Sequence, residues 1–275
     1  VTVGVQDAYG NAVPDVSVEL SLLGTGTLTG GGAVLSDATG LATFAALNID
    51  LAGTKQLSAS SGALTPAVSD TFVVSPATAM ALVFAQQPTD IAAGAAFDPV
   101  IAVSLQDAYG NVVATATDSV TLQLTSGSGS LVGATTVAAV EGIASFPGLT
   151  VEVSGAGKQI TATSGALTSA VSTSFTVSPA AAAALAFAQQ PTDIAAGVAF
   201  DPVIAVRLQD AYGNVVATAT DSVTVQLTSG AGAFVGTTTV NQGRGVMKDY
   251  RYIDGAAVLP SDAVVRAKRP ADAMQ

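Results

Sequence analysis

The chain has 275 residues, of which 49% are hydrophobic and only 5% aromatic, with no cysteine and a formal net charge of −11 at pH 7. The lack of cysteine excludes disulfides and thiolate metal sites, and the acidic balance excludes nucleic acid as a partner, because that binding needs a positive surface. No stretch reaches 18 consecutive apolar residues, so the sequence predicts no membrane-spanning segment, and the N-terminus shows no signal peptide pattern.

A long segment of the sequence occurs twice almost unchanged, at residues 84–129 and 187–232. A third, more divergent copy begins at Val1, where VTVGVQDAYGNAV matches IAVSLQDAYGNVV at residues 101–113. The period of roughly 100 residues is long enough for each copy to form a domain. Only four positions differ between the two close copies: Ala95/Val198, Ser104/Arg207, Leu122/Val225 and Ser128/Ala231.

The complete middle copy predicts a protein made of short strands, because apolar residues alternate with polar ones and no segment has helical periodicity. Phe146 and Leu149 are expected in the core. At residues 100–106 the alternation places Ser104 on the exposed face, and at residues 119–125 it places Leu122 on the buried face. The expected strands are 82–86, 100–106, 119–125, one or two within 131–140, 143–146, 158–163 and 171–177.

About seven short strands in about 100 residues is the count of an immunoglobulin-like sandwich. The Ser75-Pro76 and Ser178-Pro179 pairs, each followed by an alanine-rich stretch, mark the boundaries between copies. We therefore expect an all-β tandem array of immunoglobulin-like β-sandwich domains with short, stiff joints. The expected domains are 1–76, which lacks its first strand, a complete 77–179, and 180–240, which holds the N-terminal two-thirds of a copy. Since Val1 lies inside a copy, the chain is expected to be a fragment.

Residues 241–275 differ in composition from everything before them, and Asp249 stands where Phe146 should recur. We expect this basic tail to be poorly ordered. It could be a patch for an anionic surface, the start of another domain, or the product of a reading-frame or assembly break; the abrupt change inside a strand favours the last. Six of the nine basic residues lie in it: Arg244, Lys248, Arg251, Arg266, Lys268 and Arg269.

The sequence DAYGN recurs at residues 7–11, 107–111 and 210–214 and is the strongest candidate for a site. Its Asp and Asn oxygens, joined by Asp118, could ligate calcium, although a calcium loop needs more oxygen ligands than these. The favoured interpretation is a turn, in which Asp107 accepts hydrogen bonds from amides two residues on, Gly110 takes a positive φ and Asn111 tolerates a left-handed backbone. Tyr109 could stack on a sugar, but we expect it to pack on the end of the sandwich and hydrogen-bond its hydroxyl.

Residues suited to catalysis are few. The chain has no histidine and no cysteine, and its three glutamates, Glu19, Glu141 and Glu152, form no recurring acid pair with an aspartate. Asp98-Pro99 and Asp201-Pro202 recur, but Asp before Pro commonly opens a turn. Lys158 could pair with a serine, yet a lysine in such a strand is expected to be solvated or to snorkel, with its ammonium group in water. We predict that the chain is not an enzyme, and we assign no catalytic, cofactor-binding or metal-ligating residue and no cofactor.

The three DAYGN turns, each preceded by an alternating strand, and the G-(L/I)-A-(S/T)-F pattern at residues 40–44 and 142–146 resemble bacterial immunoglobulin-like repeats of the invasin and intimin group. The resemblance covers residues 1–240. It implies a spacer or stalk segment of a large bacterial cell-surface or secreted adhesin-like protein, located outside the cell, with neighbouring domains of the same chain as partners. The alternative is a module that binds carbohydrate or a host-surface protein through exposed loops or strand edges.

Overall fold

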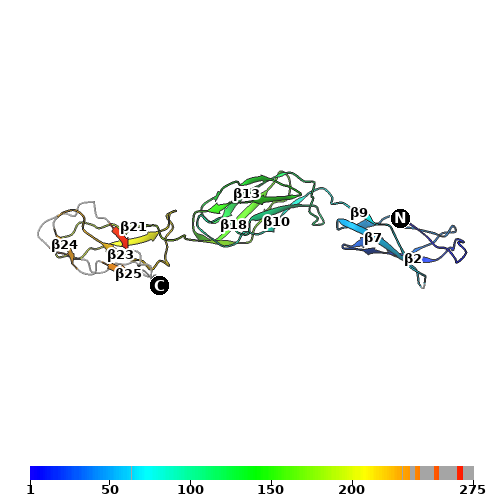
Figure 1. Ribbon diagram of the computed structural model, residues 1–275, viewed down its shortest axis with the longest axis horizontal. Coiled ribbons are helices and arrows are strands. Elements are labelled where there is room, and N and C mark those ends of the chain that lie inside the picture. Colours follow the sequence, from blue (N-terminus) through cyan, green and yellow to red (C-terminus); the bar gives the residue numbers. More distant parts are fainter. Residues whose placement is uncertain (63, 231, 236–238, 242–250, 254–264, 269–275) are drawn as a thin grey trace, which may run out of the picture.

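The computed structural model describes residues 1–62, 64–230, 232–235, 239–241, 251–253 and 265–268. The described residues form strands and turns, without a helix, and their apolar side chains gather into three separate cores. We call the strands β1–β9, β10–β20 and β21–β27 the first, second and third units, because no strand pairs outside its own group. The units follow one another in a row (Figure 1), and each is an immunoglobulin-like β-sandwich.

The second unit is the largest and shows how the sandwich is built. One sheet has the order β10-β12-β16, and a second has the order β11-β20-β18-β13-β15, with β19 also paired to β18; β14 and β17 form a separate two-stranded sheet. The two faces enclose a core in which Ile101, Val103, Leu105 and Leu149 have no exposed surface. The strands are β10 (Ala81–Gln86), β11 (Ile91–Ala92), β12 (Ile101–Gln106), β13 (Ser119–Ser126), β14 (Leu131–Val132), β15 (Thr136–Ala138), β16 (Ile143–Phe146), β17 (Thr150–Val151), β18 (Gly155–Thr163), β19 (Ala170–Val171) and β20 (Phe175–Ser178).

The first unit has the same plan without a counterpart of β10 or β11 among its described residues. Its sheets have the orders β1-β5, β3-β6 and β4-β2-β7-β8, with β9 paired to β7. The strands are β1 (Thr2–Gly4), β2 (Ser17–Leu23), β3 (Leu28–Thr29), β4 (Val34–Leu35), β5 (Leu41–Thr43), β6 (Asn48–Ile49), β7 (Gly53–Ser60), β8 (Ala67–Val68) and β9 (Phe72–Val74).

The third unit repeats the start of the second. Its first two strands pair in the same register as β10 and β12, and the rings of Phe200 and Phe234 meet edge to face at 6.3 Å. The strands are β21 (Ala184–Gln189), β22 (Ala205–Gln209), β23 (Ser222–Val225), β24 (Ala233–Val235), β25 (Thr239–Asn241), β26 (Arg251–Ile253) and β27 (Val265–Lys268). In the basic tail, β26 pairs with β24 and β27 with β23; the expectation of poor order in the rest of the tail lies outside the described residues.

The strands expected in the second unit are present, with differences in detail. The expected strand 171–177 is two strands, β19 and β20, and the two-residue strands β11 and β17 were missed because so short a pairing has no periodicity. The prediction for the core is confirmed, since Phe146, Leu149 and Leu122 are buried, as is Val225 in the third unit.

The prediction that Ser104 lies on an exposed face is wrong, since its side chain is 2% exposed. The Ser104 hydroxyl donates to the carbonyl of Val83 at 3.2 Å and accepts from the side-chain amide of Gln106 at 3.0 Å, so the neighbouring strand and the Gln106 side chain cover it. Arg207 at the same place in the third unit is exposed, because a long side chain reaches past such a cover to water.

Candidate functional site at the joints between units

Each DAYGN turn is held by its aspartate. In the second unit the Oδ1 atom of Asp107 accepts hydrogen bonds from the backbone amides of Tyr109 and Asn111, both at 2.9 Å, and Oδ2 accepts from Asn111 Nδ2 at 2.9 Å. Gly110 has a φ of 85°, which favours glycine. The predicted turn is therefore confirmed. Asn111 is not among the residues of positive φ, so it contributes its side chain rather than a left-handed backbone.

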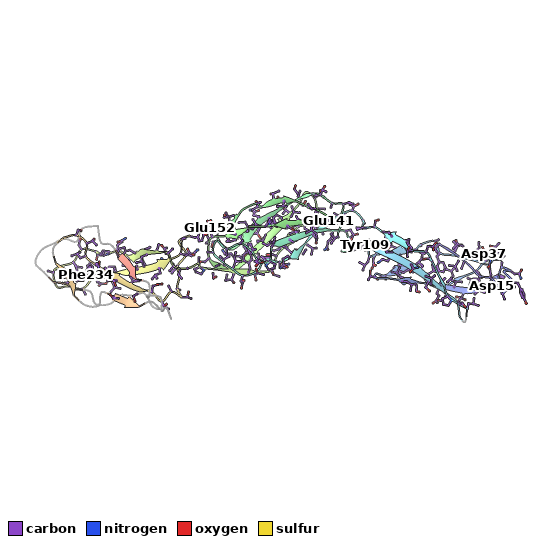
Figure 2. The ribbon with its side chains drawn as sticks, in the orientation of Figure 1. Asp15, Asp37, Tyr109, Glu141, Glu152 and Phe234 are labelled. Atoms are coloured by element: carbon purple, nitrogen blue, oxygen red, sulfur yellow. The ribbon has the colours of Figure 1, made fainter. Side chains whose placement is uncertain are left out.

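The Asn111 side chain also reaches across the first joint. Its Nδ2 donates to the carbonyl of Asp50 at 2.9 Å, and its Oδ1 accepts from the amide of Ala52 at 2.8 Å. Asp50 and Ala52 belong to the loop between β6 and β7 of the first unit. The side-chain amide of Asn111 thus bonds to the neighbouring unit through both its NH2 group and its oxygen, while the Asp107 carboxylate fixes the orientation of this amide. Figure 2 shows Tyr109, from the same turn, at this junction.

The second joint has the same contacts in the same geometry. Asn214 Nδ2 donates to the carbonyl of Glu152 at 2.7 Å, and Oδ1 accepts from the amide of Ser154 at 2.8 Å. Glu152, labelled near this junction in Figure 2, lies in the loop between β17 and β18, which corresponds to the β6–β7 loop. We use the name amide clamp for this pair of hydrogen bonds, in which the asparagine side chain of the turn (Asn111 or Asn214) bonds to the backbone of the loop of the preceding unit.

The aspartate of each turn also binds the connection between units. Asp107 Oδ2 accepts from the amide of Ala77 at 2.9 Å, and Asp210 Oδ2 accepts from the amide of Ala180, also at 2.9 Å. These alanines directly follow Pro76 and Pro179, whose rings fix the backbone φ. The joint is therefore held at two places, the amide clamp on the preceding loop and the aspartate on the linker.

The two joint aspartates are almost fully buried, with Asp107 3% and Asp210 2% exposed. Burial by itself raises the pKa of Asp107, but the hydrogen bonds from Asn111, Ala77 and Tyr109 outweigh it and lower the pKa to about 2. The pKa of Asp210 is lowered for the same reasons. Both carboxylates are therefore charged at neutral pH, as acceptors of several N–H groups should be.

The first unit has the same turn with the same internal hydrogen bonds. Asp7 accepts from the amides of Tyr9 and Asn11 and from Asn11 Nδ2, all at 2.9 Å. The hydrogen bonds of the turn are thus formed by its own residues. The turn tyrosine is 91% exposed at Tyr9, 53% at Tyr109 and 44% at Tyr212, so each joint covers part of the tyrosine of the unit that follows it.

The turn tyrosines do not take the expected role. Among the hydrogen bonds of the described residues, none involves the hydroxyl group of Tyr109, so the prediction of a corner-like hydrogen bond is wrong. The Tyr212 hydroxyl instead lies against Gly94 of the second unit, so closely that a Cβ atom there would overlap it. Because Gly94 has no side chain, the Tyr212 ring can approach the backbone of the second unit closely.

The other candidate residues do not gather into a site in the described part of the chain. Asp118 contributes no side-chain contact to the DAYGN turn, and no group of three acidic residues there is arranged to hold a metal. The Asp98-Pro99 and Asp201-Pro202 peptide bonds are both cis.

The prediction that Lys158 is solvated or snorkels to water is wrong. Its side chain has no exposed surface, its Nζ donates to the carbonyl of Ser128 at 2.5 Å, and burial lowers its pKa. Lys55 occupies the same place in the first unit and donates to the carbonyl of Thr25 at 2.6 Å. Both lysines extend along the inside of the sandwich to a loop carbonyl, where the ammonium group finds an acceptor.

The amide clamp was missed because its partners are backbone atoms. The loop residues differ between the joints, Asp50 and Ala52 in one and Glu152 and Ser154 in the other, so no side-chain pattern identifies them. The recurrence of asparagine at the end of all three turns was the one available signal, since a turn of this kind needs glycine but does not require that amide.

Comparison of the sequence with family models and with characterised proteins gives no match. Among solved structures, the chain is similar to the D0-D1 domain of intimin, with 18% identity, 64% of this chain and 88% of that chain covered and a TM-score of 0.27. InvD of Yersinia pseudotuberculosis gives 22% identity, coverage of 95% and 79% and a TM-score of 0.34.

Invasin, a bacterial integrin-binding protein, gives 16% identity, coverage of 86% of this chain and 49% of that chain and a TM-score of 0.32. Several Bacteroides glycosidases are also similar over part of this chain. The matched region covers less than a quarter of each glycosidase chain. The group named from the sequence resemblance is present among these structural neighbours.

Proposed function

We propose that the chain is a spacer or stalk segment, in which stiff joints hold successive sandwiches in line so that the array projects another part of the protein outward. The observation that carries this proposal is the amide clamp, which occurs at both joints with the same four atom types and with distances that agree within 0.2 Å. If every joint has the same geometry, the length of the array is proportional to the number of units.

Several features support a mechanical role. The linkers contain proline and no glycine between the last strand of one unit and the first strand of the next. The joint aspartates tie the linker itself, through Ala77 and Ala180, to the following unit. The near identity of residues 84–129 and 187–232 suits lengthening by duplication, since a copied unit carries its own half of the joint.

The proposed setting is a large bacterial cell-surface or secreted adhesin-like protein, outside the cell, as the sequence resemblance implies. The proposed partners are the neighbouring domains of the same chain, and the role is mechanical rather than catalytic. Carbohydrate binding would be favoured by a cluster of exposed aromatic rings, whereas the exposed tyrosines in the described residues, Tyr9, Tyr109 and Tyr212, occur one to a unit.

The test is the width of the distance distribution across the first joint. Because the chain has no cysteine, Thr29→Cys and Thr117→Cys, both at exposed positions of the first and second units, give a unique spin-label pair for pulsed electron paramagnetic resonance. A stiff joint gives one narrow distribution, and Asn111→Ala should broaden it because both clamp bonds are lost.

Asn214→Ala is the matched control, since it removes the same side chain from the other joint and should leave this distribution unchanged. A distribution that is already broad in the parent protein, or that does not respond to Asn111→Ala, would contradict the spacer proposal.

A further inference from the structure

The first and second units each have a single basic residue, and it lies inside the sandwich. Lys55 is 2% exposed and Lys158 has no exposed surface. A buried ammonium group costs stability unless hydrogen bonds compensate for the water that it has lost. The contacts of these two ammonium groups therefore indicate what the lysines do.

Each ammonium group bonds to a loop with the pattern Gly-x-Gly. Lys55 Nζ donates to the carbonyl of Thr25 at 2.6 Å and to its hydroxyl at 2.9 Å, and Lys158 Nζ donates to the carbonyl of Ser128 at 2.5 Å. We call residues 24–26 and 127–129 the glycine loops. In each loop the acceptor carbonyl belongs to the residue between the two glycines.

The first glycine of each loop leaves room for the lysine side chain. A Cβ atom on Gly127 would lie 2.7 Å from Lys158 Cγ, and one on Gly24 would lie 3.3 Å from Lys55 Cδ. Because glycine has no Cβ atom, the lysine side chain can run directly along the loop backbone. The lysine and its glycine loop thus fit each other in both units.

The second glycine of each loop packs against the loop that receives the amide clamp. A Cβ atom on Gly26 would lie 3.0 Å from Leu51 Cβ, and one on Gly129 would lie 3.0 Å from Val153 Cβ. Leu51 and Val153 each stand between the two residues whose backbone bonds to the clamp asparagine. Each glycine loop therefore lies between a buried ammonium group and the receiving side of a joint.

We propose that Lys55 and Lys158 are positioning residues of the joints: each ammonium group holds a glycine loop from inside the sandwich, and that loop fixes the backbone groups to which the amide clamp bonds. One side-chain amide can bond to a carbonyl and an N–H group together only if the receiving loop keeps these two groups in place. The inference rests on the proposed spacer role, and it extends the joint from the surface of a unit into its core.

The test measures the second joint, whose clamp is received by the unit that contains Lys158. Thr117→Cys and Thr220→Cys, exposed at equivalent positions of successive units and outside both loops, provide the spin labels. Lys158→Met should broaden the distance distribution, because methionine is also unbranched but has no ammonium group. Hydrogen exchange of the Ser154 amide, which donates to the clamp, should become faster by on the order of tenfold.

Lys55→Met is the matched control, since it removes the same group from the first unit. It should leave the second joint and the exchange of Ser154 unchanged and make the exchange of the Ala52 amide faster. Leu105→Ala controls for lost stability, because Leu105 is fully buried in the core of the second unit. It should destabilise that unit without broadening the distribution.

Gly129→Ala tests the second contact without changing the lysine, and it serves also if Lys158→Met does not fold. Its methyl group would press on Val153, so this variant should broaden the distribution as well. Gly148→Ala is its control, because Gly148 also has a positive φ, of 72°, and nothing within 4 Å of an added methyl group. Equal distributions for these two variants would contradict the support of the receiving loop by the glycine loop.

The outcomes separate this proposal from the spacer role. A distribution that stays narrow in Lys158→Met while Asn214→Ala broadens it would overturn the positioning role and leave the spacer role in place. Equal broadening by Lys158→Met and Leu105→Ala would assign the effect to lost stability and overturn the positioning role too. No broadening by Asn214→Ala would contradict both proposals.

Discussion

The hydroxyl group of Tyr212 lies directly against Gly94, which brings the turn of the third unit onto the end of the second. Gly94 has a φ of 75°, so both its backbone conformation and the close approach favour glycine. The contact adds to the amide clamp of Asn214 at the same joint. It has no counterpart among the described contacts of the first joint.

Gly94→Ala should therefore loosen the second joint. Gly197→Ala is the control, because Gly197 has a similar φ of 79° and nothing within 4 Å of the added methyl group. Both changes should destabilise their own unit by about 1–2 kcal/mol through backbone strain. Only Gly94→Ala should broaden the distance distribution between spin labels at Val132→Cys and Thr220→Cys. Equal broadening by both variants would show that strain, not the tyrosine contact, is responsible.

Asp107 should make the first joint and the second unit sensitive to acid. Its pKa is lowered to about 2 in the folded protein, against about 3.9 in an unfolded chain. A lowered carboxyl pKa contributes stability that is fully present above about pH 4 and is lost as the pH falls toward 2. The free energy of unfolding, measured by urea denaturation from pH 6 to pH 2, should fall more steeply for the parent protein than for Asp107→Asn.

The difference in stability between the parent and Asp107→Asn should accordingly be largest above pH 4 and shrink below it. Asp7→Asn provides a comparison, since the same turn there binds no linker amide. A constant difference between the parent and Asp107→Asn across this range would show that the charge of Asp107 does not contribute.

Lys158 should also make stability rise with pH, but in the alkaline range. Burial lowers its pKa from the ordinary value of a lysine, so the unfolded chain binds the proton more tightly than the folded protein does. Stability should then rise with pH between the folded pKa and about 10.4, the value in an unfolded chain. Urea denaturation at pH 7 to 10.5 should show this rise for the parent protein and a flatter profile for Lys158→Met.

Lys158→Met also removes the donor to the carbonyl of Ser128, which lowers stability at every pH. The titration of Lys158 is therefore judged from the slope of the free energy of unfolding against pH, and not from its absolute value. Identical slopes for the two proteins would mean that the buried lysine does not titrate in this range.

The sequence by itself determined the sandwich, its repetition and its turns, because each follows from local rules. Alternation at residues 119–125 places Leu122 in the core whatever the neighbours are, and an Asp-x-x-Gly-Asn segment closes through bonds within five residues. These features depend on periodicity and on short-range hydrogen bonds, which are present in the sequence.

What only the tertiary structure decided is which surfaces are covered. Ser104 and Lys158 were expected at the surface and are buried, because burial depends on the strand or loop that happens to lie over a residue. The amide clamp joins Asn111 to backbone atoms of another unit, and backbone atoms carry no sequence signature.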